Sequence, residues 1–184
     1  WDFFSGKAIC RKALPVAAVL TIPAAGSELS MRVVITNEGR KWGMASQRIR
    51  PFLAMINPEL FFTLPPWQVA CGVVDMQSHI MERYLTNTAG TGFVDGQAEA
   101  AMRAVMRFGR IVRKEPNNYE AWCQLGLAGT FAHNGFFGLG QAEDWACHGM
   151  EHELSAWNSG ISHGAGLAVI TPAYLEFVAR CNPC

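Results

Sequence analysis

Histidines and one aspartate at helical spacing are the residues of this sequence best suited to chemistry. Asp75 and His79 lie four residues apart. His148 and His152 repeat that spacing further along the chain. Side chains four residues apart project from one face of a helix, about one turn apart. His163 stands next to glycines, which let a backbone pass close to another element. One carboxylate and up to four imidazoles can therefore converge between helices.

Such a set of side chains can hold a divalent transition metal. Oxygen and nitrogen ligands without a thiolate suit Fe(II), Zn(II), Mn(II) or Ni(II). Hydrogen-bonded pairs in the protein core are the structural alternative, and spacing alone leaves both open. His133 has no partner at ligand spacing and is interpreted as a structural or surface residue. Cys147 adjoins His148, but neighbours in a helix point about 100° apart, so its thiol is not expected to be a ligand.

The secondary structure expected to carry these residues changes near residue 64, from short strands to longer helices. Before that point, continuous apolar runs predict short strands of an α/β layer, the first of them buried. These runs cover residues 14–23, 33–36 and 52–56. Proline suits the first turn of a helix, so a helix is expected to start near Pro65. Further helices are predicted at 97–114, 119–135 and 141–157, and another from His163.

The helix expected at 97–114 has one apolar and one basic face. Its apolar side chains are Ala101, Val105, Phe108 and Val112. Its basic side chains are Arg103, Arg107, Arg110 and Lys114. This pattern is typical of an amphipathic helix with a solvated face, and we interpret it so rather than as a binding surface.

Composition excludes several classes of protein. Of the 184 residues, 50% are hydrophobic and 16% are charged, which does not fit a disordered chain. The formal net charge of +0 gives no electrostatic reason to expect nucleic acid or an anionic membrane as a partner. No apolar run approaches the roughly 18 residues of a membrane span. The chain begins at Trp1, without Met and without a visible signal peptide, so we expect a cytoplasmic protein with a missing N-terminus.

Several motifs, in a fixed order along the chain, resemble one enzyme family. The helix with Asp75-x-x-x-His79 is followed by Asp144-Trp145-Ala146-Cys147-His148 and by His163-Gly164-Ala165-Gly166. Upstream stand Thr21-Ile22-Pro23-Ala24-Ala25-Gly26-Ser27-Glu28 and Asn57-Pro58-Glu59-Leu60. With these motifs, the chain resembles the iron-containing (group III) alcohol dehydrogenases over essentially all of its length. Within them it is most similar to the butanol dehydrogenase-like branch, which includes NAD(P)H-dependent aldehyde reductases.

This resemblance implies a fold of two parts. Residues 1–64 would be the end of an N-terminal α/β dinucleotide-binding domain. Residues 65–184 would form a mostly helical metal-binding domain, which is incomplete, and the active site would lie in the cleft between them. The glycine-rich pyrophosphate loop of the family lies upstream of the matching region, so we expect an internal fragment of a longer chain.

The resemblance also implies a role for individual residues. The metal ligands, for Fe(II) or Zn(II), would be Asp75, His79, His148 and His163. His152 would lie beside the nicotinamide and relay a proton without binding the metal. The residues that match the family's contacts with NAD or NADP are Thr21, Gly26, Ser27, Lys41 and Leu60.

The function implied by the resemblance is a metal-dependent oxidoreductase. It would interconvert an alcohol and its aldehyde or ketone by hydride transfer with NAD(P)(H), on a small-molecule substrate and in a possible homodimer. A metal-dependent hydrolase or lyase, and an inactive metal-binding fragment, are the alternatives. Ala25 stands where the family usually has threonine, and Arg32 where this branch commonly has glycine, so the cofactor pocket is expected to differ.

Overall fold

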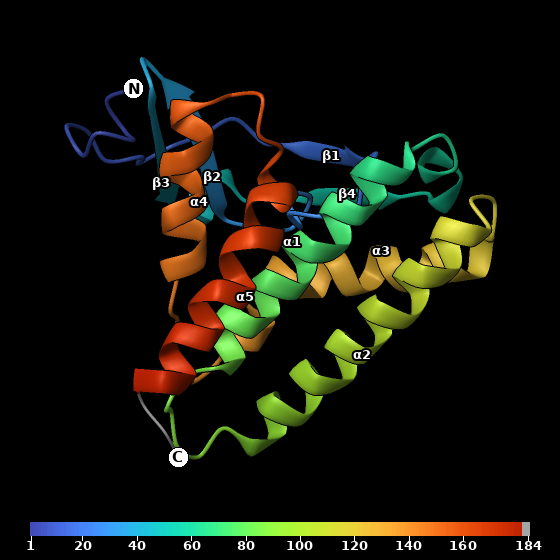
Figure 1. The fold of residues 1–184 in the computed structure, drawn as a ribbon. Coiled ribbons are helices and arrows are strands. Elements are labelled where there is room, and N and C mark those ends of the chain that lie inside the picture. The colour runs from blue at the N-terminus through green and yellow to red at the C-terminus, as the bar shows by residue number, and fades with distance from the viewer. Residues whose placement is uncertain (182–184) are drawn as a thin grey trace.

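Two small sheets and a set of helices make up the computed structural model, which describes residues 1–181 (Figure 1). The strands are β1 (Ala17–Leu20), β2 (Arg32–Asn37), β3 (Arg40–Ala45) and β4 (Leu53–Ile56). The α-helices are α1 (Pro66–Tyr84), α2 (Gly92–Lys114), α3 (Tyr119–His133), α4 (Ala146–Trp157) and α5 (His163–Cys181). The short 3-10 helices are η1 (Gln47–Ile49), η2 (Pro58–Phe61) and η3 (Phe136–Gly138). The last residues of the predicted helical domain, 182–184, lie outside the described part.

The strands form two separate pairs. β1 runs parallel to β4, with Ala17 opposite Leu53. β2 and β3 form an antiparallel hairpin. Its turn residues Glu38 and Gly39 both have positive φ, 50° and 71°, as a two-residue type I′ turn requires. β3 was not expected from the sequence, because its charged residues and glycine do not alternate like a strand.

The expectation of a buried first strand is wrong. Of β1, only Leu20 is buried, and Val19 is 54% exposed. The strand has a single partner, β4, and its outer face is not covered by another layer within residues 1–181. A continuous apolar run was therefore read as buried on both faces although one face is open.

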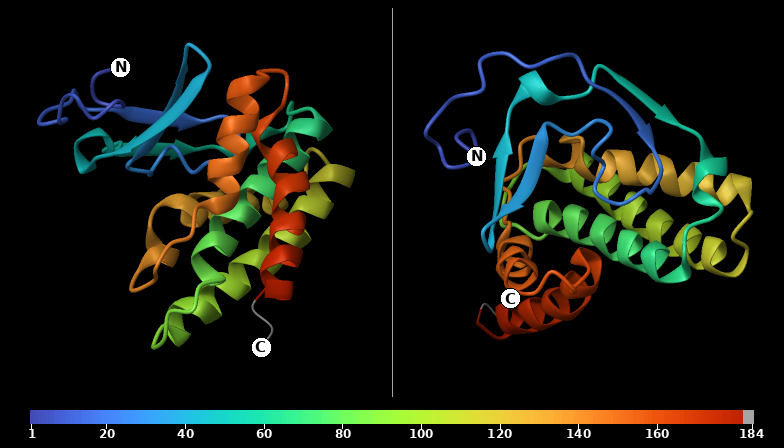
Figure 2. Two further views of the ribbon diagram at one scale, coloured as in Figure 1. Left: turned by 60° about the vertical axis from the view of Figure 1, so that its left-hand side comes forward. Right: turned by 90° about the horizontal axis from the view of Figure 1, so that it is seen from above.

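The helices pack around α1. It contacts α2, α3, α4 and α5, and Figure 2 shows it running through the middle of the helical part. Its residues Met76 and Ile80 are fully buried. Trp122 of α3 fills the neighbouring space, and its indole N–H donates to the carbonyl of Pro116 at 2.7 Å. The expected helix start near Pro65 is confirmed, because α1 begins at Pro66.

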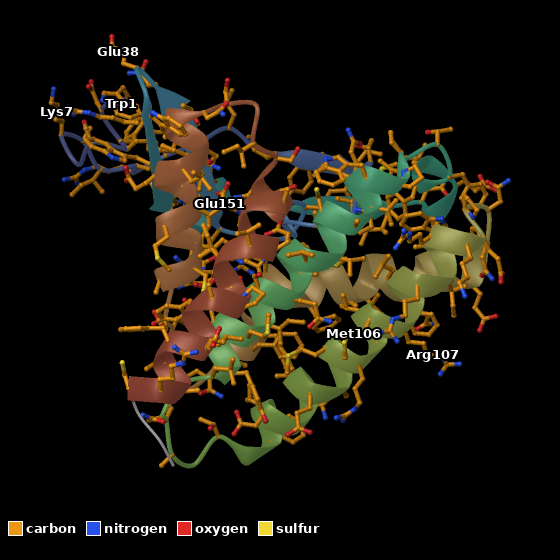
Figure 3. All side chains as sticks on the ribbon, in the orientation of Figure 1. Trp1, Lys7, Glu38, Met106, Arg107 and Glu151 are labelled. Carbon is orange, nitrogen blue, oxygen red and sulfur yellow. The ribbon has the colours of Figure 1, made fainter. Side chains whose placement is uncertain are left out.

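The basic face of α2 is solvated, as expected. Arg103, Arg107 and Arg110 are exposed, while Val105 and Val112 on the opposite side are buried. Figure 3 shows Arg107 pointing away from the helix bundle. None of the helices within residues 1–181 is long and apolar enough to cross a membrane.

The start of α5 lies in direct contact with α1 and α4. A Cβ atom at Gly164 would overlap the backbone of Cys71 in α1. A Cβ atom at Gly166 would come within 2.8 Å of Glu151 in α4. The glycines beside His163 thus allow three helices to meet, which confirms the close approach that the sequence predicts.

We predict that Gly164→Ala destabilises the protein by about 1–3 kcal/mol, because the added methyl group meets a backbone carbonyl that cannot move aside. Gly96→Ala in α2 is the matched control. A Cβ atom there meets nothing within 4 Å, and alanine is about 0.5–1 kcal/mol better than glycine inside a helix. Chemical denaturation of both variants checks the pair. Equal stability of the two variants would contradict the close approach of α5 to α1.

Candidate metal centre

A cavity of about 670 Å³ opens between the β2–β3 hairpin and the helices. Its walls come from the hairpin, α1, α4, the end of α3 and the start of α5. The four residues expected to bind metal all line this cavity: Asp75, His79, His148 and His163. The fold therefore brings together residues that are almost 90 positions apart in the chain.

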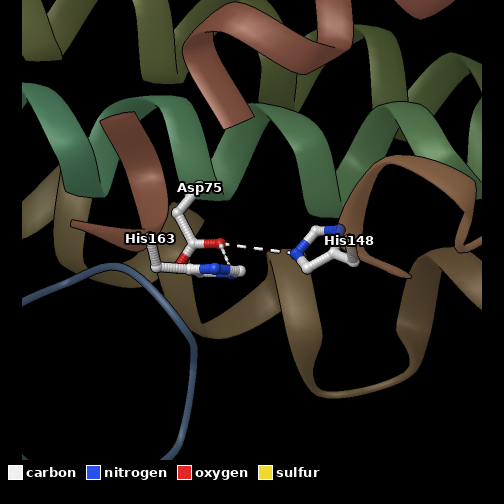
Figure 4. Close-up of side chains that lie close together, drawn as sticks. All are labelled: Asp75, His148 and His163. Atoms are coloured by element: carbon white, nitrogen blue, oxygen red, sulfur yellow. Dashed lines mark ion pairs between the residues drawn. The ribbon is translucent and has the colours of Figure 1, made fainter. Parts of the chain in front are cut away.

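Oδ1 of Asp75 is the atom at which the cluster meets. It lies 3.4 Å from Nδ1 of His79, 3.5 Å from Nε2 of His148 and 3.6 Å from Nε2 of His163. Figure 4 shows His148 and His163 on different sides of the Asp75 carboxylate. The ligand atoms of Asp75, His148 and His163 all lie within 4.8 Å of one another. His79 stands outside this tightest group and joins the cluster through its contact with Asp75.

The atoms at the centre of the cluster are buried without hydrogen-bond partners among residues 1–181. They are Oδ1 of Asp75, Nδ1 of His79 and Nε2 of His148. Unpaired buried polar atoms are costly and rare. Ligand atoms about 2.1 Å from one tetrahedral ion lie about 3.4 Å apart, close to the separations observed here. The donor set therefore fits a divalent metal ion.

Glu82 holds His148 in place from the neighbouring helix. Its Oε2 contacts Nδ1 of His148. Its Oε1 accepts the backbone N–H groups of Cys147 at 2.7 Å and of His148 at 3.2 Å. These N–H groups belong to the first turn of α4, where a helix has no partners of its own. Glu82 thus caps α4 and directs Nε2 of His148 toward Asp75.

Glu151 orients His163, as Glu82 orients His148. It is fully buried on α4, and its Oε2 contacts Nδ1 of His163. A carboxylate only accepts, so Nδ1 of His163 carries a proton and the lone pair of Nε2 is free for a cation shared with Asp75. Nζ of Lys41 lies 3.4 Å from the same Oε2 and donates to Ser155 Oγ at 2.9 Å.

Burial and neighbouring charges shift the pKa values of this cluster. Burial, with the imidazoles of His133 and His148, lowers the pKa of His79 well below its usual range. Burial acts the same way on His148, but the neighbouring carboxylates of Asp75 and Glu82 outweigh it and raise the pKa of His148 to about 9. Because imidazole binds metals in its neutral form, a proton and a metal ion compete for His148.

His152 lines the cavity next to this cluster. Its ring centroid lies 5.3 Å from that of His163 and 6.2 Å from that of His148. Burial and the positive charge of Lys41 lower the pKa of His152 to about 4. The ring is therefore neutral at neutral pH.

The residues expected to bind the cofactor fall into two places. Ser27 and Lys41 line the cavity, and Gly26 is buried just before Ser27. Thr21 directly follows β1, and Leu60 lies in η2 after β4, away from the cavity lining. Both therefore stand beyond the carboxyl ends of the parallel strands, where open α/β sheets bind ligands.

His133, interpreted as a structural or surface residue, is half-buried and has a partner on another helix. Its Nδ1 lies 3.1 Å from the Arg83 guanidinium, and it lines the cavity beside His79. Sequence spacing could not find this contact, because His133 lies on a different helix from His79. Glu82 and Glu151 were also missed, although a signal exists. Glu82 lies seven residues after Asp75, and Glu151 three after His148, which places each on the face of a metal-site residue.

Comparison with known proteins identifies relatives among alcohol dehydrogenases and aldehyde reductases. Residues 69–183 match the model of the Fe-containing alcohol dehydrogenase family, C-terminal. The chain is 38% identical over 180 residues to NADH-dependent butanol dehydrogenase A of Clostridium acetobutylicum, covering 97% of this chain and 46% of that protein. It is 39% identical over 170 residues to NADPH-dependent aldehyde reductase YqhD of Escherichia coli, covering 91% and 43% respectively. The chain thus spans somewhat less than half the length of these relatives.

Solved structures show the same similarity. The crystal structure of NADH-dependent butanol dehydrogenase A from Thermotoga maritima matches with a TM-score of 0.94 at 41% identity, over 100% of this chain and 46% of that one. The crystal structure of YqhD from E. coli matches with a TM-score of 0.93 at 36% identity, over 97% and 46%. The arrangement of the helices and the small sheet is therefore that of these proteins.

We predict that Glu82→Gln weakens the binding of zinc or iron about 10- to 100-fold. Glu82 uses both oxygens as acceptors, whereas glutamine offers one acceptor and places a donor against another donor. Isothermal titration with each metal measures the loss. Glu153→Gln, on the exposed side of α4, is the control and should leave affinity unchanged. Because Glu82 also caps α4, Glu151→Gln provides a second test of the outer carboxylates. Unchanged affinity in both folded variants would contradict this role.

Proposed function

The chain belongs to the Fe-containing alcohol dehydrogenase family, and we propose that it acts as a metal-dependent oxidoreductase that interconverts an alcohol and its aldehyde or ketone with NAD(P)(H). One observation carries this proposal. Three imidazoles surround a buried carboxylate oxygen without a hydrogen-bond partner in the described chain, at the wall of a cavity large enough for a substrate and part of a cofactor.

The proposed metal ligands are Asp75, His79, His148 and His163, with Fe(II) or Zn(II) as the ion. The ion would supply Lewis acidity at the substrate oxygen, and the nicotinamide would supply the hydride chemistry. Asp75 gives the ligand set a negative charge and a hard oxygen, which suits Fe(II). Glu82 and Glu151 keep two imidazoles oriented, so the set is ordered before the ion arrives.

Other residues of the cavity would bind the cofactor, carry the proton and exclude water. Lys41 places a positive charge beside Glu151, and together with Ser27 it offers donors to a cofactor in the cavity. His152 lies in the cavity beside His163, where its imidazole would pass on the proton that an alcohol releases and return it for the reverse reaction. Trp145 lines the cavity beside His148 and excludes water from that side.

We also propose the division of the chain at residue 64. The β-strands all precede this point and the α-helices all follow it within residues 1–181. Residues 1–64 would contribute the end of a dinucleotide-binding domain, and residues 65–184 the metal-binding one. The names of the relatives, which include NADH- and NADPH-dependent enzymes, support NAD or NADP as the cofactor.

One feature of the cavity favours an alternative function, that of a metal-dependent hydrolase. Glu151, His152 and His163 form a second group with metal-ligand distances, as a two-metal hydrolase would need. However, the Glu151 carboxylate is already in contact with His163 and Lys41. We therefore favour the oxidoreductase.

We predict that the anaerobically purified protein carries about one iron or zinc per chain. Removal by a chelator should abolish oxidation of 1-butanol with NAD or NADP, and added metal should restore it. His163→Ala, which removes one ligand, should lose both the metal and the activity. Metal content is measured by mass spectrometry and activity by NAD(P)H absorbance. Full activity in the chelated, metal-free protein would contradict the proposal.

We predict that Lys41→Ala raises the KM for the nicotinamide cofactor about tenfold or more, since a hydrogen bond to a charged group is worth about 1.5–3 kcal/mol. Lys7→Ala is the control, because Lys7 is exposed and lies outside the cavity lining. Metal content is measured in parallel, since Lys41 also contacts Glu151. A normal KM in a variant with normal metal content would exclude Lys41 from the cofactor site.

A further inference from the structure

The fifth histidine lies directly beside the proposed metal ligands. The ring centroids of His133 and His79 are 4.0 Å apart, and both residues line the same cavity. His133 is the last residue of α3, so it comes from a helix that contributes none of the proposed ligands. Because His133 lies beside the proposed ligand set without belonging to it, its own hydrogen bonds decide what it can do.

Arg83 fixes the proton of His133. The guanidinium is almost completely buried and lies with one terminal nitrogen 3.1 Å from Nδ1 of His133. It also donates to the carbonyls of His79 at 2.6 Å and Ala132 at 3.1 Å, which hold it in position. Arginine has no acceptor, so Nδ1 must accept and the ring proton must be on Nε2.

Nε2 of His133 therefore carries a proton that is available to the cavity. It has no hydrogen-bond partner among residues 1–181. Unlike Oδ1 of Asp75 and Nε2 of His148, it is not sealed away from solvent. A protonated Nε2 and an occupied Nδ1 leave no lone pair for a metal. His133 is thus suited to donate a hydrogen bond and not to act as a ligand.

Arg32 adds a second donor to the same wall. Its guanidinium is 2.7 Å from Oε2 of Glu143 and stacks on Trp145, 4.9 Å from the ring centre. Arg83 donates to the other oxygen of Glu143 at 2.9 Å. Two arginines thus share one carboxylate, so this wall has more donors than acceptors. Arg32 also lines the cavity, where its remaining N–H groups can reach a bound molecule.

We propose that His133 and Arg32 form a subsite that selects substrates with a second oxygen, a hydroxyl or carbonyl on the carbon next to the reacting one. This inference rests on the proposed function, since the first oxygen is taken to face the metal cluster. The ring centroids of His133 and His79 are 4.0 Å apart, so His133 stands beside the place where the first oxygen would bind. It is a specificity residue, because it contacts the second oxygen and not the reacting atoms.

Two measurements on the zinc-loaded protein test this subsite. Imidazole nitrogen NMR should show His133 protonated at Nε2 and not at Nδ1. Titration with 1-butanol and with 1,2-butanediol then compares two ligands that differ by one hydroxyl group. The diol should bind roughly two- to tenfold more tightly, as one additional hydrogen bond provides. An Nδ1-protonated or charged ring, equal binding of the two alcohols, or binding of neither, would overturn the proposal.

His133→Asn and Met44→Leu form a matched pair of variants. Asparagine keeps an acceptor for Arg83, but its amide N–H groups lie closer to the backbone than Nε2 of His133 and do not reach the same point, so the preference for the diol should disappear. Met44 lines the same cavity without a polar group, so Met44→Leu should keep the preference. Turnover with NAD or NADP is assayed separately. A protein that oxidises neither alcohol but keeps the diol preference would contradict the proposed function and still support the subsite.

Discussion

The site depends on the neutralisation of one carboxylate buried inside a helical core. An ionised group taken out of water is strongly destabilising unless it is paired and hydrogen-bonded. Imidazoles from α1, α4 and α5 approach Oδ1 of Asp75, and a cation at their centre would complete its partners. Each imidazole also needs a fixed orientation. Glu82 and Glu151 provide it for His148 and His163. A second set of polar side chains therefore surrounds the imidazoles.

The parts of this arrangement that depend on local geometry could be predicted from the sequence. The spacing of Asp75 and His79 places both on one helical face, and α1 has the expected start. The glycines next to His163 indicated a close approach, which the overlap at Gly164 explains. Recognition of the family supplied the rest of the proposed ligand set, which spacing alone left open. The comparison with known proteins supports the family and not the role of each residue.

Other features could not be predicted, because they depend on contacts between distant segments. His133 meets His79 only through the packing of α3 against α1, and Arg83 links the two helices. β3 is a strand because β2 and a tight turn provide its partner, although its own residues favour no strand. The burial of β1 was overestimated, since an apolar run does not show whether a second layer covers it. In each case a tertiary contact, or its absence, decided the outcome.

The positions of His148 and His163 in their helices have an electrostatic consequence. His148 is in the first turn of α4, and His163 is the first residue of α5. Each helix carries a partial positive charge at its N-terminus, of about half an elementary charge. Two such ends therefore face the same point as the proposed cation. The carboxylates of Asp75, Glu82 and Glu151 carry more negative charge than the two helix ends supply, so the dipoles act only locally, where each helix begins. A hydroxyl group bound near the start of both helices would lie in their local positive potential, so the backbone itself would stabilise the oxygen that remains when the proton is lost.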